Sequence, residues 1–404
     1  MSTGILYHAL ELQGYEIVQE TMRGEEIVLH IEPLEEALRC PVCGSHDVIR
    51  RGCYARTLRG LSFGSMPLHL VVEVPRVECE DCGALRRVTV SLAHGRRSYT
   101  KTFEQLVLGL SRRMSMSDVA RHLRIGWDIV KDIQKRYLGK RFGNIELGHL
   151  RQIAIDEISI GRGHRYLTVV LDLQSGAVVF VGDGKGADAL LPFWALLKEA
   201  GAKVEAVATD MSPAFISAVQ KNLPESVLVF DHFHVIKLFN DKLSELRRDL
   251  YREATQQLEK DVLKGTRWLL LKNPENLDEG RNETQRLQEA VKLNEPLACV
   301  YYMKEELRTL WGQPDKATAG CLLKSWIARA EKSGIGMLRK FANTLAAHRN
   351  QILNYYDHPI STGPLEGTNT KIRVMQRQAY GFRDYVFLKL KICGLHETRI
   401  ELIG

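Results

Sequence analysis

The stretch RQIAID at residues 151–156 is an apolar run that ends in a carboxylate, and it predicts the first strand of a new domain. Further elements follow in the order strand, strand, helix, strand, helix and strand. We expect them at residues 166–173, 177–181, 189–200, 203–209, 213–222 and 227–230. A Gln-Ser-Gly turn separates the second strand from the third. This alternation predicts a mixed α/β domain.

Three consecutive strands followed by helix, strand, helix and strand is the element order of an RNase H-like core. In that core the first and fourth strands lie side by side, so Asp156 and Asp210, at the ends of these strands, are expected to meet. Two carboxylates held together are unfavourable unless a cation neutralises them. A pair of Mg²⁺ or Mn²⁺ ions about 4 Å apart would do so, while activating a nucleophile and stabilising the departing oxygen of a phosphodiester. The sequence therefore predicts a divalent-metal site here.

The best candidate for a third carboxylate that closes such a site is Glu366, in the stretch STGPLEGTN at residues 361–369. The proline of this stretch suits the first position of a helix, which places Glu366 in the first turn. Thr370, Arg373 and Arg377 follow at +4, +7 and +11 and share its helix face. Taken singly, each acid is more often a cap or a surface group than a catalyst. Their joint placement beside a basic stripe favours an enzyme that holds a phosphate backbone against metal ions.

Four cysteines form two pairs, CPVCG at residues 40–44 and CEDCG at residues 79–83. Zinc takes four soft ligands at tetrahedral corners, and a CxxC turn points two thiolates at one position. We therefore expect structural Zn²⁺ bound by Cys40, Cys43, Cys79 and Cys82, with a redox or core role as the alternative. The β-like run at residues 68–74 predicts a ribbon hairpin between the pairs. The other four cysteines, expected to be small buried hydrophobes, are Cys53, Cys299, Cys321 and Cys393.

From residue 102 the chain becomes helical, with apolar residues at helical spacing over 103–110. A second short helix is expected at residues 117–123 with Ser117 as its cap, then a turn at 124–126 and a third helix over 127–137. The third helix carries Lys131, Lys135 and Arg136. Two short helices joined by a glycine turn resemble a DNA-binding helix-turn-helix. A plain three-helix packing unit is the alternative.

The bulk composition sets the class of protein. A chain of 404 residues implies about two to four domains, and 45% hydrophobic with 26% charged residues is typical of a soluble globular protein. No apolar run approaches the ~18 residues of a membrane-spanning helix, and the first residues lack a signal-peptide pattern, so we expect a cytoplasmic protein without membrane contact. Residues 1–38 hold eight acidic residues and one basic one, whereas residues 39–141 hold twenty Lys or Arg against nine acids. The basic block suggests a polyanion such as nucleic acid as partner.

At these motifs the sequence resembles a known group, the DDE transposases of bacterial insertion sequences, specifically the ISL-three family. The resemblance covers nearly the whole chain and includes both cysteine pairs. Its further motifs are AIDE at residues 154–157, ATDMS at 208–212, FDHFH at 230–234, and PLEG at 364–367 continuing to Arg383. Thr362 stands where the family more often has Asn, which affects only the local cap.

The resemblance implies that Asp156, Asp210 and Glu366 are a catalytic triad that holds Mg²⁺ or Mn²⁺. It implies double-stranded DNA as partner, both the terminal inverted repeats of an element and the target DNA. Because both ends must be held at once, a homodimer or higher oligomer is expected. DNA contacts on the last basic helix are expected from Lys371, Arg373 and Arg377.

Asp231 and His234 look like the Asp-x-x-His element that several transposase groups carry after the second catalytic Asp. They would support the metal site or the scissile strand, and a simple hydrogen-bonded pair at a strand-to-helix junction is an equal alternative. The later tryptophans are expected to pack in the core, with stacking on an extruded base as the alternative; they are Trp268, Trp311 and Trp326.

The fold class expected is multidomain α/β, with a zinc ribbon, a helix-turn-helix and an RNase H-like core interrupted by an all-helical insertion. The segments are an acidic leader at 1–38, the ribbon at 39–98, the helix-turn-helix at 99–145, the first part of the core at 150–240, the insertion at 241–345 and the last core helices at 346–404. The function expected is transposition by hydrolysis and strand transfer. Two rivals are a catalytically silent transposase-derived DNA-binding regulator and a nuclease or resolvase-like enzyme that cuts but never joins.

Overall fold

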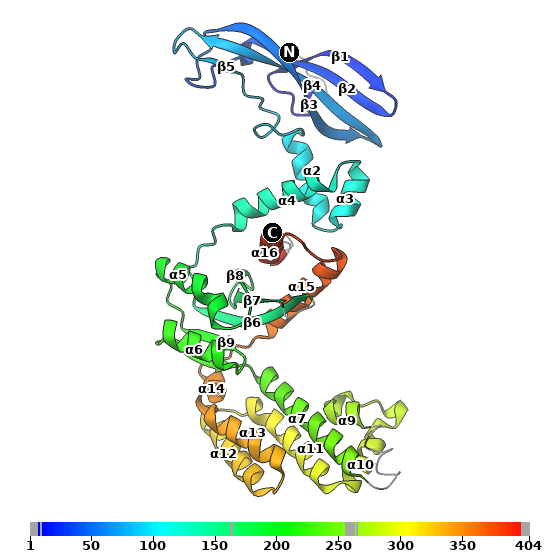
Figure 1. The fold of residues 1–404 in the computed structure, drawn as a ribbon, viewed down its shortest axis with the longest axis vertical. Coiled ribbons are helices and arrows are strands. Elements are labelled where there is room, and N and C mark those ends of the chain that lie inside the picture. The colour runs from blue at the N-terminus through cyan, green and yellow to red at the C-terminus, as the bar shows by residue number, and fades with distance from the viewer. Residues whose placement is uncertain (1–6, 9, 162–164, 255–262, 264–265, 397–404) are drawn as a thin grey trace. The chain divides into compact units, whose positions relative to one another are not determined.

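A computed structural model describes residues 7–8, 10–161, 165–254, 263 and 266–396. The chain divides into two compact units, Met1–Arg141 and Phe142–Gly404 (Figure 1). Each unit has its own sheet. None of the helices in the described residues is long and apolar enough to cross a membrane.

The sheet of the first unit has the strand order β1-β2-β4-β3, with β5 paired to β4 (Figure 1). The strands are β1 (Tyr15–Arg23), β2 (Glu26–Pro33), β3 (Val48–Phe63), β4 (Met66–Cys79) and β5 (Leu85–Arg87), and a short 3-10 turn, η1 (Glu35–Ala37), follows β2. The antiparallel hairpin of β3 and β4 is the hairpin predicted between the cysteine pairs.

The sheet continues across the boundary that the charge pattern set at residue 38. β2 pairs in parallel with β4, so most of the segment predicted as an acidic leader belongs to the same sheet as the ribbon hairpin. The physical reason is apolar: Leu29 and Ile31 of β2 are buried in one cluster with Leu70 of β4. The boundary at residue 38 was predicted from charged residues, which are exposed on these strands, and the charge pattern contains no information about the buried apolar residues that join the strands.

Three helices complete the first unit, α2 (Lys101–Ser111), α3 (Met116–Leu123) and α4 (Trp127–Phe142). They enclose a core that includes Phe103, Val119 and Ile133. The predicted cap of α3 is wrong: the hydroxyl of Ser115, not that of Ser117, accepts the amide hydrogen of Asp118, at 3.2 Å.

Arg59 of β3 joins this helical core to the sheet. It is 8% exposed, and it donates to the carbonyl oxygens of Gly60 and Leu68, both at 3.0 Å. Its guanidinium lies 5.2 Å from the ring centre of Phe103. The sheet and the first helix are therefore connected by a buried cation as well as by the chain.

The sheet of the second unit has the order β10-β9-β6-β7-β8 (Figure 1). Its strands are β6 (Gln152–Gly161), β7 (Arg165–Asp172), β8 (Val178–Asp183), β9 (Ala206–Thr209) and β10 (Val227–Phe230). The first three are antiparallel to one another, whereas β9 runs parallel to β6 and β10 runs parallel to β9. The expectation that the first and fourth strands lie side by side is confirmed.

Helices cover both faces of this sheet (Figure 1). The 3-10 turn η2 (Ala187–Leu190) leads into α5 (Leu191–Glu199), and α6 (Pro213–Asn222) follows β9; their apolar residues share a cluster with Ile153, Ile155 and Val207. On the opposite face, α15 (Gly363–Gln378) and α16 (Tyr385–Cys393) pack against Ala154 and Ala208.

A helical segment lies between β10 and α15. Within the described residues its α-helices are α7 (His232–Glu253), α9 (Arg267–Leu271), α10 (Glu283–Leu293), α11 (Glu295–Arg308), α12 (Lys316–Lys332), α13 (Gly336–Ala347) and α14 (Arg349–Leu353). Short 3-10 turns lie between or after these helices, η3 (Pro274–Asn276), η4 (Glu279–Arg281), η5 (Thr309–Gly312), η6 (Asn354–Tyr356) and, after α16, η7 (Gly394–His396).

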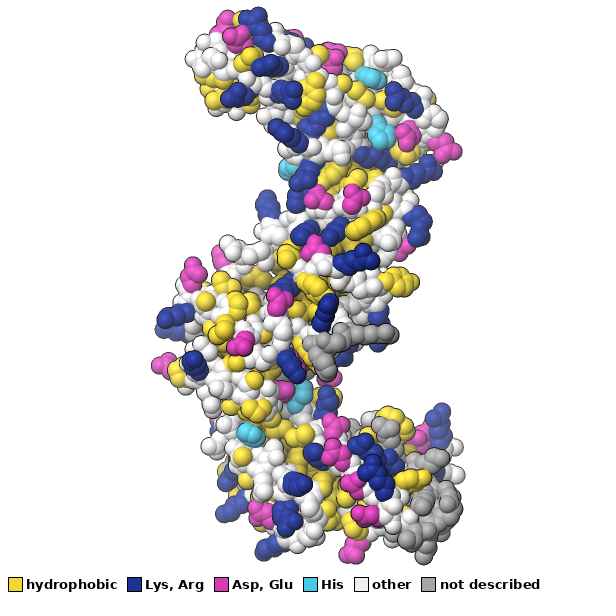
Figure 2. Space-filling view, viewed as in Figure 1, with side chains coloured by type: hydrophobic (Ala, Val, Ile, Leu, Met, Phe, Trp, Pro, Cys, Tyr) yellow, Lys and Arg dark blue, Asp and Glu magenta, His cyan; other side chains and the backbone are white. Residues whose placement is uncertain are grey.

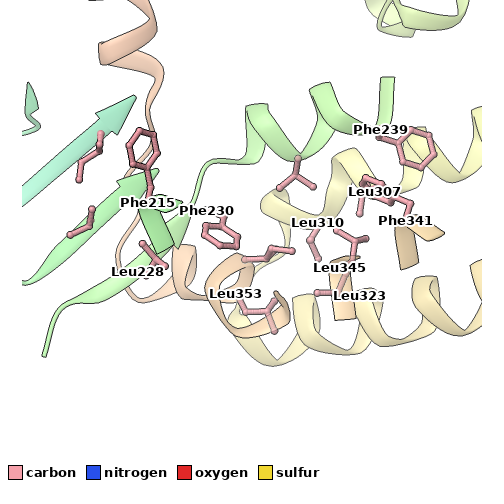
Figure 3. Close-up of a cluster of buried hydrophobic side chains, with 14 of the residues drawn as sticks. Phe215, Leu228, Phe230, Phe239, Leu307, Leu310, Leu323, Phe341, Leu345 and Leu353 are labelled. Carbon is pink, nitrogen blue, oxygen red and sulfur yellow. The ribbon is translucent and has the colours of Figure 1, made fainter. Parts of the chain in front are cut away.

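Aromatic packing holds these helices together. Figure 3 shows Phe239 of α7 beside Phe341 of α13, and the centres of their rings are 4.9 Å apart. Trp326 is fully buried, and its indole Nε1 donates to the carbonyl oxygen of Met303 at 2.8 Å, as core packing predicts. The same prediction is wrong for Trp268, which is 65% exposed.

Candidate functional site

Asp156 and Asp210 come together at the junction of β6 and β9. The register pairs Ala154 with Ala208 and Ile155 with Thr209, so the next position on each chain holds an aspartate. Strand alternation places both on the face of the sheet that α15 covers, and neighbouring strands lie about 4.8 Å apart. Backbone amides orient both carboxylates, from Glu157 to Asp156 Oδ1 at 2.8 Å and from Ser212 to Asp210 Oδ1 at 3.0 Å.

The surroundings of Asp156 oppose its ionised state. Burial raises the pKa of Asp156, and the negative charges of Asp210 and Glu157 raise it further. Burial also raises the pKa of Glu157, again with a contribution from Asp210. Clustered carboxylates with raised pKa values are stabilised by a positive charge placed among them.

Helix α15 reaches this pair through Asn369. Its side chain is 4% exposed, and its Nδ2 donates to Asp156 Oδ2 at 2.8 Å. Its Oδ1 is buried and has no hydrogen-bond partner among the described residues. A residue in the second turn of the helix, which sequence reasoning missed, is therefore in direct contact with the first predicted acid.

Glu366 lies in the first turn of α15, as predicted, and is exposed. It precedes Asn369 by three residues, about 4.5 Å along the helix axis. The structure does not gather Asp156, Asp210 and Glu366 as tightly as a ligand shell: in the described residues, only the cysteines form a group of three or more ligating side chains with all ligand atoms within 4.8 Å.

Asp231 and His234 form a hydrogen-bonded pair where β10 passes into α7. His234 Nδ1 lies 3.2 Å from Asp231 Oδ2, and Asp231 is 1% exposed. The hydroxyl of Thr362 also donates to Asp231 Oδ2, at 2.7 Å, and lies 3.3 Å from His234 Nδ1. Thr362 stands at the N-cap of α15 but makes no capping hydrogen bond, so the view that it affects only the local cap is wrong.

The charge of this pair extends to the two aspartates. Burial by itself would lower the pKa of His234, but the hydrogen bond to Asp231 and the charges of Asp156, Asp231 and Asp210 raise it overall. Burial would raise the pKa of Asp231, but its hydrogen bonds from His234 and Thr362 lower it. The arrangement favours an imidazolium paired with a carboxylate next to the acid cluster.

The basic residues proposed for DNA contact fall into two groups. Arg136 is engaged inside the first unit, 3.3 Å from Glu104 and 2.7 Å from the hydroxyl of Tyr99. Lys131 and Lys135 are half-buried, and each has an interaction partner within the chain.

The α15 group differs from the first. Lys371, Arg373 and Arg377 are exposed, and none has an ion-pair partner among the residues that the structure describes. Arg373 and Arg377 lie on the flank of α15 that carries Glu366, whereas Lys371 lies about 140° around the helix from it. Lys and Arg side chains are spread over the visible surface of both units (Figure 2).

The four paired cysteines converge, as predicted. Cys40 Sγ lies 3.6 Å from Cys82 Sγ, Cys43 Sγ lies 3.5 Å from Cys79 Sγ, and all four sulfurs are within 4.8 Å of one another. Sulfurs that each lie about 2.3 Å from one Zn²⁺ are about 3.8 Å apart, so the cluster fits that ion. Hydrogen bonds from the amides of Cys43 and Val42 lower the pKa of Cys40 to about 6.

The remaining cysteines differ from the expectation of small buried hydrophobes. Cys53 and Cys321 are exposed, and that expectation is wrong for both. Cys299 and Cys393 are partly buried. None of the four belongs to the zinc-binding cluster.

Known proteins match these regions in order. Residues 36–82 match the zinc finger of the IS204/IS1001/IS1096/IS1165 transposases, residues 88–138 match the helix-turn-helix domain of transposase family ISL3, and residues 153–392 match the ISL3 family described as a transposase. The predicted zinc ribbon and helix-turn-helix are confirmed.

Two curated relatives match nearly the whole chain. The transposase for insertion sequence element IS1001 of Bordetella parapertussis is 31% identical over 380 residues, which cover 91% of each chain. The transposase for insertion sequence element IS1557 of Mycobacterium tuberculosis is 31% identical over 389 residues, covering 89% of this chain and 86% of the relative.

Proposed function

The chain belongs to the ISL3 family of transposases, and on that premise we propose that it cuts and joins DNA by a metal-dependent DDE mechanism. The observation that carries the proposal is the meeting of Asp156 and Asp210 on one face of the second sheet, beneath the helix that bears Glu366. These three acids are the proposed catalytic triad.

We propose that the second sheet and its flanking helices form an RNase H-like core. The order β10-β9-β6-β7-β8, with three antiparallel strands and two parallel ones, supports this assignment. The helices between β10 and α15 would then be an insertion within the core, over about residues 241–345.

Asp156, Asp210 and Glu366 would hold Mg²⁺ or Mn²⁺. Carboxylate oxygens are the ligands that these hard ions prefer. The raised pKa of Asp156 and the unpartnered amide oxygen of Asn369 fit a cation at this position. When bound, the ions make water a stronger nucleophile and stabilise the oxygen that leaves phosphorus.

The chain's own side chains position the DNA. Arg373 and Arg377 lie on the helix flank of Glu366 and have no ion-pair partner among the described residues, so their charge is open to phosphates. The imidazolium of His234, paired with the carboxylate of Asp231, lies next to the acids and would support the scissile strand. The zinc ribbon and helix-turn-helix would bind the terminal inverted repeats. Lys131 and Lys135 on the third helix would contact this DNA.

The chemistry needs no external energy source. Water adds to phosphorus and the bond from phosphorus to the 3′ oxygen breaks, which leaves a 3′-hydroxyl and a 5′-phosphate. That hydroxyl then attacks a phosphodiester of target DNA, and the 3′ oxygen of the target leaves. Both element ends must be held together, so the active form is proposed to be a dimer or larger assembly.

The test uses purified protein and DNA fragments from either side of the gene that encodes it. With Mg²⁺ or Mn²⁺, the wild type should cut these fragments and join a pre-nicked end to a plasmid. Asp210→Asn should bind the same fragments and cut about 10³-fold more slowly, because it loses one charged metal ligand. Full activity of Asp210→Asn would show that Asp210 is not a catalytic residue and would contradict the DDE mechanism. If the wild type binds these fragments without cutting them, the chain is a regulator. If it cuts them without joining, the chain is a nuclease.

A further inference from the structure

Helix α15 must place Glu366 against a sheet that is distant in sequence. Its apolar residues Leu365 and Ile372 are fully buried against the face that contains Ala154 and Ala208. Apolar contact holds the helix on the sheet but is non-directional. Hydrogen bonds have strict geometry, so buried hydrogen bonds can fix the position and rotation of the helix on the sheet.

Two buried polar contacts meet this need, one on each side of Glu366 in the sequence. The hydroxyl of Thr362, which is 1% exposed, binds Asp231 Oδ2 at 2.7 Å. The amide of Asn369, which is 4% exposed, binds Asp156 Oδ2 at 2.8 Å. These contacts attach the helix to the strand that ends at Phe230 and to the strand that carries the first acid.

We propose that Thr362 and Asn369 are positioning residues of the metal site, a two-point clamp that sets where α15 presents Glu366. The inference rests on the proposed function of the three acids. Thr362 acts through the Asp231–His234 pair, because its hydroxyl donates a charge-assisted hydrogen bond to the Asp231 carboxylate. Asn369 orients the carboxylate of Asp156. The Oδ1 of Asn369 is a buried acceptor next to that carboxylate and has no hydrogen-bond partner among the described residues.

The clamp also gives the Asp231–His234 pair a defined task. Asp231 receives two hydrogen bonds at one oxygen, from its own helix and from α15. The pair thus connects the start of α7 to the start of α15, across 131 residues of sequence. Removal of the Thr362 hydroxyl cuts that connection without removing either charge.

The variants remove each contact at nearly constant volume. Thr362→Val lacks the hydroxyl and Thr362→Ser retains it; Asn369→Leu lacks the amide. Matched controls elsewhere in the second unit are Thr344→Val, which removes a hydroxyl bonded to Lys340, and Asn222→Leu, which removes an amide bonded to Ala218. All are made in the full chain, and thermal unfolding is recorded for each.

The first readout is binding of Mn²⁺ alone, measured from the electron paramagnetic resonance signal of the free ion. Asn369→Leu should weaken Mn²⁺ binding about tenfold or more, the loss typical when the hydrogen-bond partner of a metal ligand is removed. Thr362→Val should also weaken Mn²⁺ binding, because the start of α15 loses its hydrogen bond to Asp231. Thr362→Ser and both controls should remain within about twofold of the wild type. In the cutting assay, kcat should fall while KM for DNA stays unchanged, because the basic flank of α15 is intact.

Three outcomes separate the clamp from the function on which it rests. If the wild type binds Mn²⁺ and cuts DNA while Thr362→Val and Asn369→Leu match it in both assays, the clamp is wrong and the function stands. If Thr362→Ser is as impaired as Thr362→Val, the hydroxyl is not responsible and the clamp is again wrong. If the wild type shows no Mn²⁺ binding that depends on Asp156 and Asp210, both proposals fall.

Discussion

Asp172 is 1% exposed, more deeply buried than Asp156, but its oxygens are occupied by the turn that it closes. They accept the amide hydrogens of Gln174 at 3.2 Å and Ser175 at 3.0 Å. Asp156 receives one amide and one side-chain donor, and it faces a second carboxylate. At the scale of single residues, burial alone does not distinguish these two aspartates, whereas the neighbouring carboxylate of Asp210 does.

This contrast gives a prediction for Asp156→Asn in the absence of divalent ions. The folded protein holds the pKa of Asp156 above its ordinary value, so ionised Asp156 lowers stability at pH 7 and ceases to do so as pH falls and the group takes up a proton. Asp156→Asn should therefore unfold at a higher temperature than the wild type at pH 7. The gain should shrink towards pH 4, and calorimetry in a chelating buffer measures both. A variant that is less stable than the wild type at pH 7 would contradict this assignment of the charge.

The sequence predicted the elements of the second unit well, because their apolar patterns are local. The bounds expected for α6 and β10 agree with the structure, and β6 and β9 are neighbours as expected. The strand β6 runs on to Gly161, past Asp156, which the sequence predicted as its end, because the whole of β7 remains available for pairing. That Asp156 and Asp210 lie next to each other was predicted from the strand order alone.

The roles of Thr362 and Asn369 could not be predicted in this way. Each role depends on a partner more than 100 residues away, Asp231 and Asp156 respectively, and no periodicity encodes such a contact. The only sequence signal was weak: Asn369 follows Glu366 by three residues, the spacing that shares a helix face.

The start of α3 gives a prediction at the scale of the element. Ser115 accepts the amide of Asp118, and its hydroxyl donates to the Asp118 carboxylate at 2.6 Å, whereas Ser117 is exposed within the first turn. Ser115→Ala should lower the free energy of unfolding of the first unit by about 1 kcal/mol, the ordinary cost of a lost cap. Ser117→Ala is the matched control and should change it by less than about 0.5 kcal/mol. If Ser115→Ala and Ser117→Ala lower the free energy of unfolding equally in denaturant melts, Ser115 is not the cap of α3.

At the scale of the whole molecule, zinc is expected to stabilise one unit and not the other. The four cysteines lie at the ends of β3 and β4, so loss of the ion removes the closure of that hairpin and leaves the sheet of the second unit untouched. A chelator should raise hydrogen exchange over residues 48–87 and leave β6 to β10 protected. Cys82→Ser should lose the expected single zinc per chain, whereas Cys53→Ser should retain it. Equal loss of protection in both units would contradict this division.

The proposed DDE mechanism depends on a divalent ion bound between Asp156 and Asp210. The most direct measurement is the anomalous scattering of Mn²⁺ in crystals of the full chain with DNA. A Mn²⁺ peak is expected within coordination distance of carboxylate oxygens of both aspartates, with Glu366 turned towards it. Mn²⁺ peaks confined to other surfaces, with these two carboxylates unligated beside bound DNA, would contradict it.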